Sequence, residues 1–239
     1  MENKMTDREL WKAYWKNYKF TAIPRKPVYK DYILPRKCGN FIEIGGFPGL
    51  NAGYFYKHVC PDVTLLDFYV DREVIHRVER DNGIPEGTIK AIEADFFRFR
   101  TEHSYDMVFS QGFIEHFQDT KDVIARHMAL MSPAGQLLII LPNLRGLNGL
   151  VQYVFDRPNL RIHNLKSMDR AHLKRICTEL GLKNIRVEYT RKPMVWLEPK
   201  PGKEVRIKRF IVKLLSCALK LFPVKCRLLS PYIIISATL

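Results

Sequence analysis

The sequence predicts a doubly wound α/β fold built on one mostly parallel β-sheet. Short apolar runs alternate with helical patterns between residues 40 and 143. These runs are almost continuously apolar, which is typical of strands buried on both faces of a parallel sheet. A glycine-rich turn joins the first run to the first helix. With 239 residues, 46% of them hydrophobic, the chain can bury one such core, and disorder is excluded as its main state.

The central elements follow from this alternation. Strands are expected at 40–44, 63–68, 88–93, 106–110 and 136–141. Helices are expected between them at 50–59, 71–82 and 119–131. Strands joined by helices form a parallel sheet with helices on both faces.

The flanking segments extend this core. Thr6–Glu9 is a capping-box pattern that starts a helix bearing Trp11, Tyr14, Trp15 and Tyr18. The stretch after Pro142 reads as irregular, followed by a helix at 168–180 and a strand at 184–190. Residues 232–239 form a last strand after a long excursion, which fits an antiparallel edge strand. The expected sheet therefore has seven strands.

The turn after the first strand has the features of a ligand loop. Residues 41–50 read Phe-Ile-Glu-Ile-Gly-Gly-Phe-Pro-Gly-Leu, a strand, a glycine turn and a helix start. Such a turn lets backbone approach a ligand and directs helix N–H groups at it. Asp67 ends the next apolar run 18 residues past Gly49, a spacing that suits the two hydroxyls of a ribose. We therefore expect a nucleoside-containing cofactor.

Two later strand ends complete the pattern. The third strand is followed by Ala94-Asp95-Phe96, and the fourth runs into Ser110-Gln111-Gly112-Phe113-Ile114-Glu115-His116-Phe117. In a doubly wound sheet all of these lie at the carboxyl edge, where ligands bind. In this order they resemble the class I S-adenosylmethionine-dependent methyltransferases, which have a Rossmann-like fold. More narrowly they look like the small-molecule branch that includes ubiquinone-biosynthesis type O-methyltransferases. The resemblance covers about 40–190 and the terminal strand.

The resemblance implies a role in S-adenosylmethionine binding for each position. The methionine end would be held by Glu43 and the backbone of Gly45, Gly46 and Gly49. The nucleoside would be held by Asp67 at the ribose, Asp95 at the adenine amino group and Phe96 beside the ring. Carbonyls near Ser110 and Gln111 would meet the cofactor's own amino group. One position departs from the family: its middle loop glycine is Phe47 here. Phe47 must therefore point away from the cofactor.

His116 is the first candidate for catalysis. It follows the fourth strand, where the acceptor would lie, and imidazole is suited to removing a hydroxyl proton at neutral pH. The alternative is a structural histidine, and Glu115 is expected to cap or orient the loop. His163 could contact the acceptor or be an ordinary loop histidine. No metal is expected, since the remaining histidines lack ligand spacing and the five cysteines show no CxxC pair. Scattered cysteines indicate reduced thiols and a cytoplasmic protein.

Positive charge is concentrated near the C-terminus. The formal net charge is +14, and residues 191–231 hold eleven Lys and Arg against two Glu, a net +9. In the helical pattern at 206–222, Arg206, Arg209, Lys213 and Lys220 share one stripe. The other side carries Ile207, Phe210, Ile211, Leu214, Leu215, Ala218, Leu221 and Phe222. This pattern suits an interfacial helix on an anionic membrane, a gate for a hydrophobic substrate, or packing on the domain or a second subunit.

These patterns predict three parts and one leading function. We divide the chain into an N-terminal helical cap (1–36), a cofactor-binding domain (37–190 with 232–239) and a basic amphipathic insertion (191–231). The leading function is O-methylation of a small-molecule or lipid-linked acceptor, at the inner face of a membrane. The alternatives are RNA methylation, which the high pI suits, and a catalytically idle membrane-docked scaffold. A nicotinamide-dinucleotide site is disfavoured because Phe47 replaces the second glycine of GxGxxG.

Overall fold

The computed structural model describes residues 4–16, 21–190, 192–198, 203–221 and 224–239. The strands are β1 (Asn40–Ile44), β2 (Asp62–Asp67), β3 (Ile89–Glu93), β4 (Tyr105–Gln111), β5 (Met131–Pro142), β6 (Lys183–Tyr189) and β7 (Tyr232–Thr238). The α-helices are α1 (Arg8–Lys16), α2 (Leu50–His58), α3 (Arg72–Asp81), α4 (Thr120–Met128), α5 (Leu147–Phe155), α6 (Arg157–Arg161), α7 (Arg170–Glu179) and α8 (Lys203–Leu219). Short 3₁₀ turns are η1 (Lys30–Tyr32), η2 (Ile114–His116) and η3 (Leu165–Met168).

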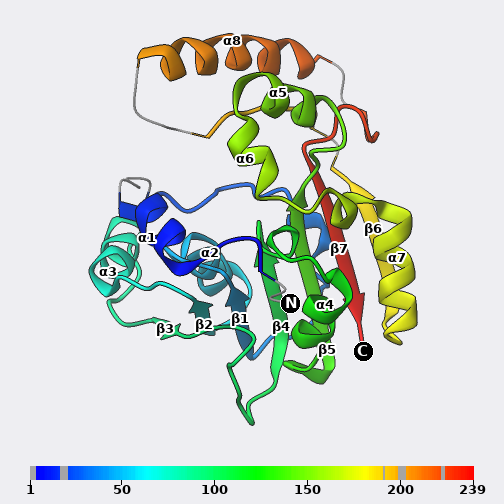
Figure 1. Cartoon of the computed structure of the whole chain (residues 1–239). Coiled ribbons are helices and arrows are strands. Elements are labelled where there is room, and N and C mark those ends of the chain that lie inside the picture. The colour runs from blue at the N-terminus through cyan, green and yellow to red at the C-terminus, as the bar shows by residue number, and fades with distance from the viewer. Residues whose placement is uncertain (1–3, 17–20, 191, 199–202, 222–223) are drawn as a thin grey trace.

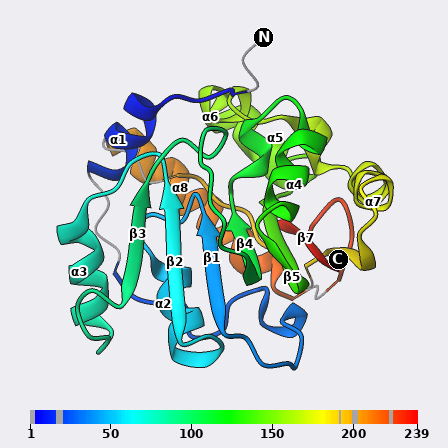
Figure 2. The ribbon, with the colours of Figure 1, turned by 90° about the horizontal axis from the view of Figure 1, so that it is seen from below.

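The strands form one seven-stranded sheet in the order β3-β2-β1-β4-β5-β7-β6 (Figure 2). The pairs among β1 to β5 are parallel. The C-terminal β7 is antiparallel to both of its neighbours, β5 and β6. The predicted doubly wound sheet with its antiparallel C-terminal strand is confirmed, and the carboxyl ends of β1, β2 and β4 lie side by side.

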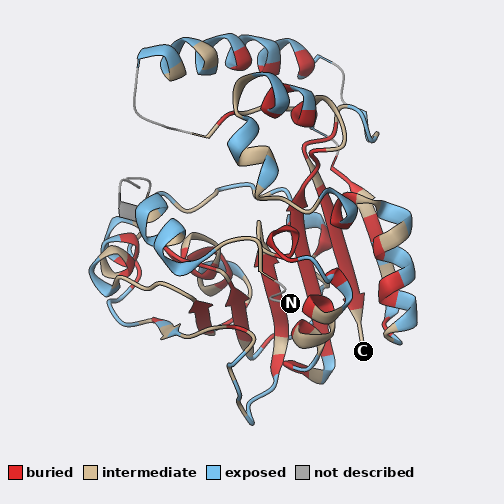
Figure 3. Ribbon diagram, viewed as in Figure 1, coloured by how far each residue is buried: buried red, intermediate tan, exposed pale blue. Residues whose placement is uncertain are grey.

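The strands of the sheet are largely buried (Figure 3), and hydrophobic side chains pack on both of its faces. On one face, side chains of α2 and α3 pack with Tyr29 and Phe41 in a buried cluster. On the other face, α4 and α7 pack with residues such as Ile42 and Val108. Neighbouring residues of β1 thus enter opposite cores, because successive side chains of a strand point to opposite faces.

The helices α5, α6 and α8 form a separate layer above the sheet, which we call the cover (Figure 1). Helix α8 rests on α5 through Val151, Val212 and Leu219. The prediction of an irregular stretch after Pro142 is wrong, because this stretch contains α5 and α6. The expectation rested on Gly146, Gly149 and Pro158, but Gly149 lies within α5, which buried Asn148 and Gln152 anchor. Both are buried, and their side-chain amides donate to the backbone carbonyls of the extended segment at 194–196.

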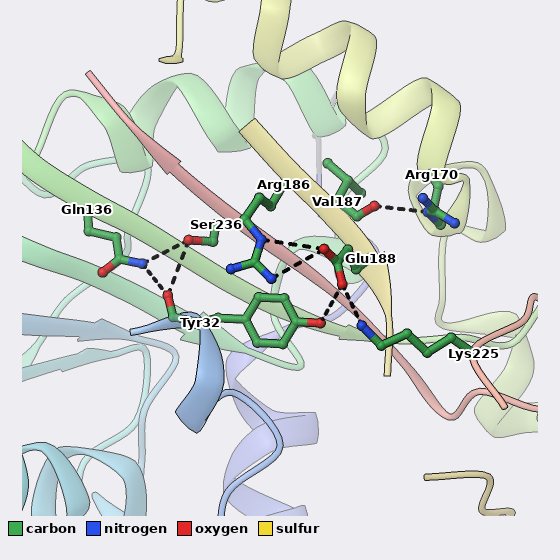
Figure 4. A network of polar contacts seen from close by, with 8 residues as sticks. All are labelled: Tyr32, Gln136, Arg170, Arg186, Val187, Glu188, Lys225 and Ser236. Atoms are coloured by element: carbon green, nitrogen blue, oxygen red, sulfur yellow. Dashed lines mark hydrogen bonds and ion pairs between the residues drawn. The ribbon is translucent and has the colours of Figure 1, made fainter. Parts of the chain in front are cut away.

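A polar network joins the N-terminal segment to the sheet edge (Figure 4). Glu188 on β6 accepts hydrogen bonds from the Tyr32 hydroxyl at 3.0 Å and the Lys225 ammonium at 2.6 Å. Beside it, the Gln136 side chain donates to the Tyr32 carbonyl and to the Ser236 hydroxyl. Lys225 leads from the cover back to β7, so this network fixes the end of the cover against the sheet.

Two cysteines differ from the expected reduced state. Cys38 and Cys60 form a disulfide with a Cα–Cα distance of 5.1 Å, so the prediction of five free thiols is wrong. Sequence reasoning missed the pair because the two residues are 22 positions apart and meet only when α2 packs beside β1. Cys177, Cys217 and Cys226 are free.

Candidate active site

A cavity of about 680 Å³ opens at the carboxyl edge of the sheet. Its floor comes from the ends of β1, β2 and β4, and one wall comes from Leu10, Trp11, Tyr14 and Trp15 of α1. Another wall includes Asn159 of α6 in the cover and residues Met194, Trp196 and Glu198. This wall meets α1, because the Tyr14 hydroxyl donates to the Glu198 carboxylate at 3.1 Å. Tyr18, expected on the same aromatic stripe, lies outside the described residues. The volume is that of a typical small-molecule site.

The glycine loop after β1 has the close contacts that only glycine permits. Gly45 has a φ of +65°, and a Cβ there would overlap the Phe113 ring. A Cβ on Gly46 would overlap the Glu43 side chain. Both glycines line the cavity, whereas Gly49 begins α2 with a φ of +96° and lies outside the lining. Gly45 and Gly46 therefore present backbone to a ligand, and Gly49 shapes the turn.

Glu43 is fully buried beneath this loop and forms part of a hydrogen-bond chain. Its carboxylate accepts from the Asn51 side chain at 2.8 Å and from the Ala52 N–H at 2.9 Å. The Tyr29 hydroxyl in turn donates to Asn51 at 2.8 Å. Burial raises the pKa of Glu43 to about 8, although these hydrogen bonds oppose the rise. Glu43 thus fixes the start of α2 below the loop, and Asn51 and Tyr29, which sequence reasoning missed, also line the cavity.

Asp67 holds the glycine loop from the end of β2. One carboxylate oxygen accepts from the Phe47 N–H at 2.9 Å, and the other accepts from the Tyr69 N–H at 3.2 Å. Burial raises the pKa of Asp67 to about 6, opposed by these hydrogen bonds. Each carboxylate oxygen has two lone pairs and can accept a further hydrogen bond, and Asp67 lines the cavity. This arrangement is compatible with a ribose diol, a role that stays a prediction.

Phe47 stands in the wall of the cavity rather than across it. Its ring packs edge-on against Trp15 at 5.3 Å and Tyr69 at 5.5 Å between ring centroids, and it is 3% exposed. The side chain thus joins the loop to α1 and to the segment after β2. The loop has a bulky residue in place of a glycine, and α1 covers it.

The third strand end brings Asp95 and Phe96 to the same cavity. Burial opposes ionisation of Asp95, but its ion pair with Lys4 and the N–H of Phe97 lower its pKa. The Lys4 ammonium also lies 4.5 Å from the centre of the Phe68 ring. The N-terminal segment therefore closes over the position expected for adenine.

The fourth strand end divides the predicted residues. Gln111 and Gly112 line the cavity, but Ser110 does not. The Ser110 hydroxyl is hydrogen-bonded to His127 Nε2 at 3.1 Å in the core beneath the site. His127 is buried and its Nδ1 is bonded to the Val123 carbonyl, a structural role as expected.

Glu115, His116 and His163 lie together in the cavity wall beyond the glycine loop. The His116 and His163 rings are 4.7 Å apart, and Trp11 packs edge-on against His116 at 5.1 Å. Glu115 Oε2 is buried and has no hydrogen-bond partner within the part of the chain that the structure describes. The segment after α6 is held here because the Asn164 N–H donates to the Glu115 carbonyl at 2.7 Å. Sequence reasoning could not place His163 beside His116, since the two are 47 positions apart.

Burial dominates the ionisation of this group. It lowers the pKa of His116 to about 3, with a smaller contribution from His163, and it also lowers the pKa of His163. It raises the pKa of Glu115 to about 8. Both imidazoles are therefore neutral at pH 7 in the ligand-free protein, and each can offer a lone pair.

Comparison with known protein families decides the assignment. The family model described as a methyltransferase domain matches residues 21–187. This range includes the glycine loop and the candidate site residues Asp67, Asp95, Glu115 and His116. The chain belongs to the methyltransferase-domain family. Its cofactor is S-adenosylmethionine, as the resemblance implied, and the cradle formed by the glycine loop and Asp67 fits the backbone and ribose contacts of that molecule. No curated protein sequence matches the chain significantly.

Solved structures share the fold at low sequence identity. Phosphoethanolamine N-methyltransferase 2 of Haemonchus contortus, bound to S-adenosylmethionine, matches with a TM-score of 0.62 and 17% identity over 88% of this chain. The match covers 51% of the Haemonchus contortus chain, so the present chain spans about half of the length of that protein. An S-adenosylmethionine-dependent methyltransferase of Archaeoglobus fulgidus matches with a TM-score of 0.52 and 18% identity, covering 97% of this chain and 95% of the other. Geranyl diphosphate C-methyltransferase of Streptomyces coelicolor A3(2) matches with a TM-score of 0.55 and 12% identity, covering 84% of this chain and 74% of the other. These identities indicate a shared fold alone.

Proposed function

We propose that this methyltransferase transfers the methyl group of S-adenosylmethionine to a hydroxyl oxygen of an apolar small-molecule or lipid-linked acceptor, as in the ubiquinone-biosynthesis type O-methyltransferases. The observation that carries the proposal is that His116 and Glu115 both line the cavity wall beside the cofactor cradle. The described residues of the lining include two lysines, Lys4 and Lys26, and no arginine. Lys4 is paired with Asp95. Aromatic and apolar side chains dominate the rest, which favours an uncharged acceptor over a phosphorylated one.

The proposed reaction is an in-line displacement. The acceptor oxygen attacks the methyl carbon while the carbon–sulfur bond breaks, leaving S-adenosylhomocysteine. His116 Nδ1 is bonded to the Ile162 carbonyl at 3.0 Å, so Nδ1 carries the proton and Nε2 has the lone pair that accepts one from the hydroxyl. Burial lowers the pKa of His116 to about 3, so in the ligand-free protein it is a weak base and its contribution depends on how closely it is positioned on the hydroxyl. Trp11 and the rest of the α1 wall exclude water from this end of the cavity.

Replacing His116 with asparagine tests this role. We expect the turnover number to fall at least ~100-fold while the affinity for S-adenosylmethionine changes less than ~3-fold, because His116 lies outside the cofactor cradle. The assay measures S-adenosylhomocysteine released with a panel of phenolic and prenylated hydroxyl compounds. His103→Asn is the control, since His103 is exposed and outside the lining. Full turnover in His116→Asn with an accepted substrate would overturn the proposal.

We further propose that the cover docks on an anionic membrane and receives the acceptor from it. Helix α8 packs on the protein through Val212, Ser216 and Leu219. Its apolar side chains Ile207, Phe210, Ile211, Leu214 and Leu215 are 39–62% exposed. Arg206, Arg209, Lys213 and Lys220 are exposed on the adjoining stripe, and Phe222 lies outside the described residues. Lys208 is half-buried and paired with Glu204.

Position and charge both support this surface. In the segment before α8, Met194, Trp196 and Glu198 line the cavity, whereas Val195 and Leu197 pack with Val212 and Leu219 of α8. The cover that bears the docking face therefore adjoins the cavity. Exposed apolar side chains beside a cationic stripe match the interface of an anionic leaflet such as the inner face of a cell membrane. Within the described residues no helix is long and apolar enough to span a bilayer, and the proposed attachment is peripheral.

Vesicle sedimentation tests the docking surface. We expect binding to phosphatidylglycerol-containing vesicles but little binding to phosphatidylcholine alone, because about 1 kcal/mol comes from each Lys or Arg near an anionic surface. The double variant Phe210→Ser, Leu214→Ser should bind at least ~10-fold more weakly, as apolar burial is lost. Leu165→Ser, an exposed leucine outside α8, should bind like the wild type. Equal vesicle binding by the wild type and both variants would argue against a membrane partner. So would RNA binding by the lipid-free protein that is lost in Lys213→Glu.

A further inference from the structure

We propose that Glu115, His116 and His163 form a binding site for a divalent transition-metal ion at the acceptor end of the cavity. The inference deepens the proposed function, on which its catalytic meaning rests. It stands on three observations: the proximity of the three groups, the hydrogen bonds of the two imidazoles, and the orphaned carboxylate oxygen.

The three side chains converge. One ligand atom from each residue lies within 4.8 Å of the ligand atoms of the other two. In sites with metal–nitrogen and metal–oxygen bonds of about 2.0–2.2 Å, ligand atoms lie about 3–4 Å apart. Small rotations of the side chains therefore bring this group to ligand distance.

The hydrogen bonds of the imidazoles prepare them as ligands. His116 Nδ1 is bonded to the Ile162 carbonyl at 3.0 Å, and His163 Nδ1 is bonded to the Asn159 carbonyl at 2.6 Å. A carbonyl only accepts, so each Nδ1 carries the proton and each Nε2 keeps its lone pair. This is the arrangement of metal-ligating histidines, whose second nitrogen is typically bonded to a backbone carbonyl or a carboxylate.

The carboxylate of Glu115 provides an independent indication. Its side chain is 1% exposed, and Oε2 has no hydrogen-bond partner among the described residues. A buried polar atom without a partner is costly and indicates a missing ligand. Among the described residues, neither lysine of the lining is paired with Glu115: Lys4 is bound to Asp95, and no ion pair joins Lys26 to Glu115. A cation would satisfy Oε2.

The donor set selects the kind of ion. Two imidazoles and one carboxylate suit Zn²⁺, Fe²⁺, Co²⁺ or Mn²⁺ rather than the all-oxygen shell that Ca²⁺ prefers. Three protein ligands leave at least one position open, as in catalytic metal sites. An acceptor hydroxyl bound at that position would lose its proton more readily, as metal-bound water does. In that state His116 acts as a ligand, and in the metal-free protein its Nε2 is the proton acceptor.

Metal titration of the chelator-stripped protein, without an affinity tag of histidines, tests the site. Cobalt(II) should bind with one equivalent per chain and produce visible absorption of a nitrogen-coordinated ion. His163→Ala should weaken binding at least ~10-fold (~1.4 kcal/mol), and so should Glu115→Gln, which keeps the side-chain shape. The matched control His103→Ala removes an exposed histidine outside the cavity and should leave binding unchanged.

Two results would overturn the inference: no stoichiometric binding by the wild type, or equal binding by wild type and His163→Ala. Circular dichroism and S-adenosylmethionine titration of the same samples show whether each variant is folded with an intact cofactor site. A wild type that binds the cofactor but no metal removes the metal site and leaves the proposed methyl transfer standing. A wild type that binds metal but no cofactor keeps the metal site and removes the proposed methyl transfer.

Discussion

Replacing Asp67 with alanine is expected to weaken S-adenosylmethionine binding at least ~10-fold (~1.4 kcal/mol). The variant removes the carboxylate that is predicted to accept from the ribose diol, and the Phe47 and Tyr69 N–H groups lose their acceptor. Leaving buried donors unsatisfied costs about 1–3 kcal/mol, so the glycine loop also loses its support. Calorimetric titration at pH 7.5 measures the effect, since Asp67 is ionised above its pKa of about 6.

Asp62 provides the matched control for Asp67. It lies at the opposite end of β2 and pairs with Lys90 on the surface. Asp62→Ala removes the same kind of side chain from the same strand and should leave cofactor affinity unchanged. Asp67→Asn keeps the shape and one acceptor oxygen, and separates loss of charge from loss of the loop. Unchanged affinity in both Asp67 variants would show that the ribose is held elsewhere.

Gly45→Ala is expected to lower both stability and cofactor affinity. A side chain at a φ of +65° costs about 1–2 kcal/mol in any protein. At this site the Cβ also meets the Phe113 ring, and overpacking of a tight site adds about 1–3 kcal/mol. The loop must shift to relieve the overlap, which moves the backbone away from the cofactor. Urea unfolding and calorimetric titration of the variant measure the two effects.

Gly83→Ala isolates the contribution of the overlap. Gly83 has nearly the same backbone conformation, with a φ of +63°, but a Cβ there meets no atom within 4 Å. Gly83→Ala should therefore lose about 1–2 kcal/mol of stability and none of its cofactor affinity. If Gly45→Ala and Gly83→Ala were equally stable and bound cofactor equally well, the close packing of the loop would have no functional role.

The parts of the site that the sequence predicts are those that follow directly from strand ends. Apolar runs mark the strands, and a parallel sheet places the residues after them at one edge. Gly45, Asp67, Asp95 and His116 were accordingly placed on the same cavity, and the structure confirms this arrangement. The roles assigned to them by resemblance remain predictions.

What the sequence does not predict depends on contacts between distant segments. Gly149 favours an irregular stretch, yet it lies within α5, which Asn148 and Gln152 stabilise by pairing with the backbone at 194–196. His163 has no recognisable spacing from His116, because the segment after α6 brings it there. Ser110 itself lies outside the cavity lining, although its neighbour Gln111 belongs to it, and the role predicted for the carbonyls near these two residues stays a prediction. The three-part division of the chain stays a prediction.

The central claim is that the loop bearing Phe47, with Asp67 beneath it, holds S-adenosylmethionine. Calorimetric titration of the wild-type chain with S-adenosylmethionine and with S-adenosylhomocysteine tests it most directly. The account predicts micromolar binding of both at one common site, with each displacing the other. If neither compound bound at millimolar concentration, Phe47 and α1 would close the loop to the cofactor, and the chain would be an idle scaffold with the methyltransferase fold.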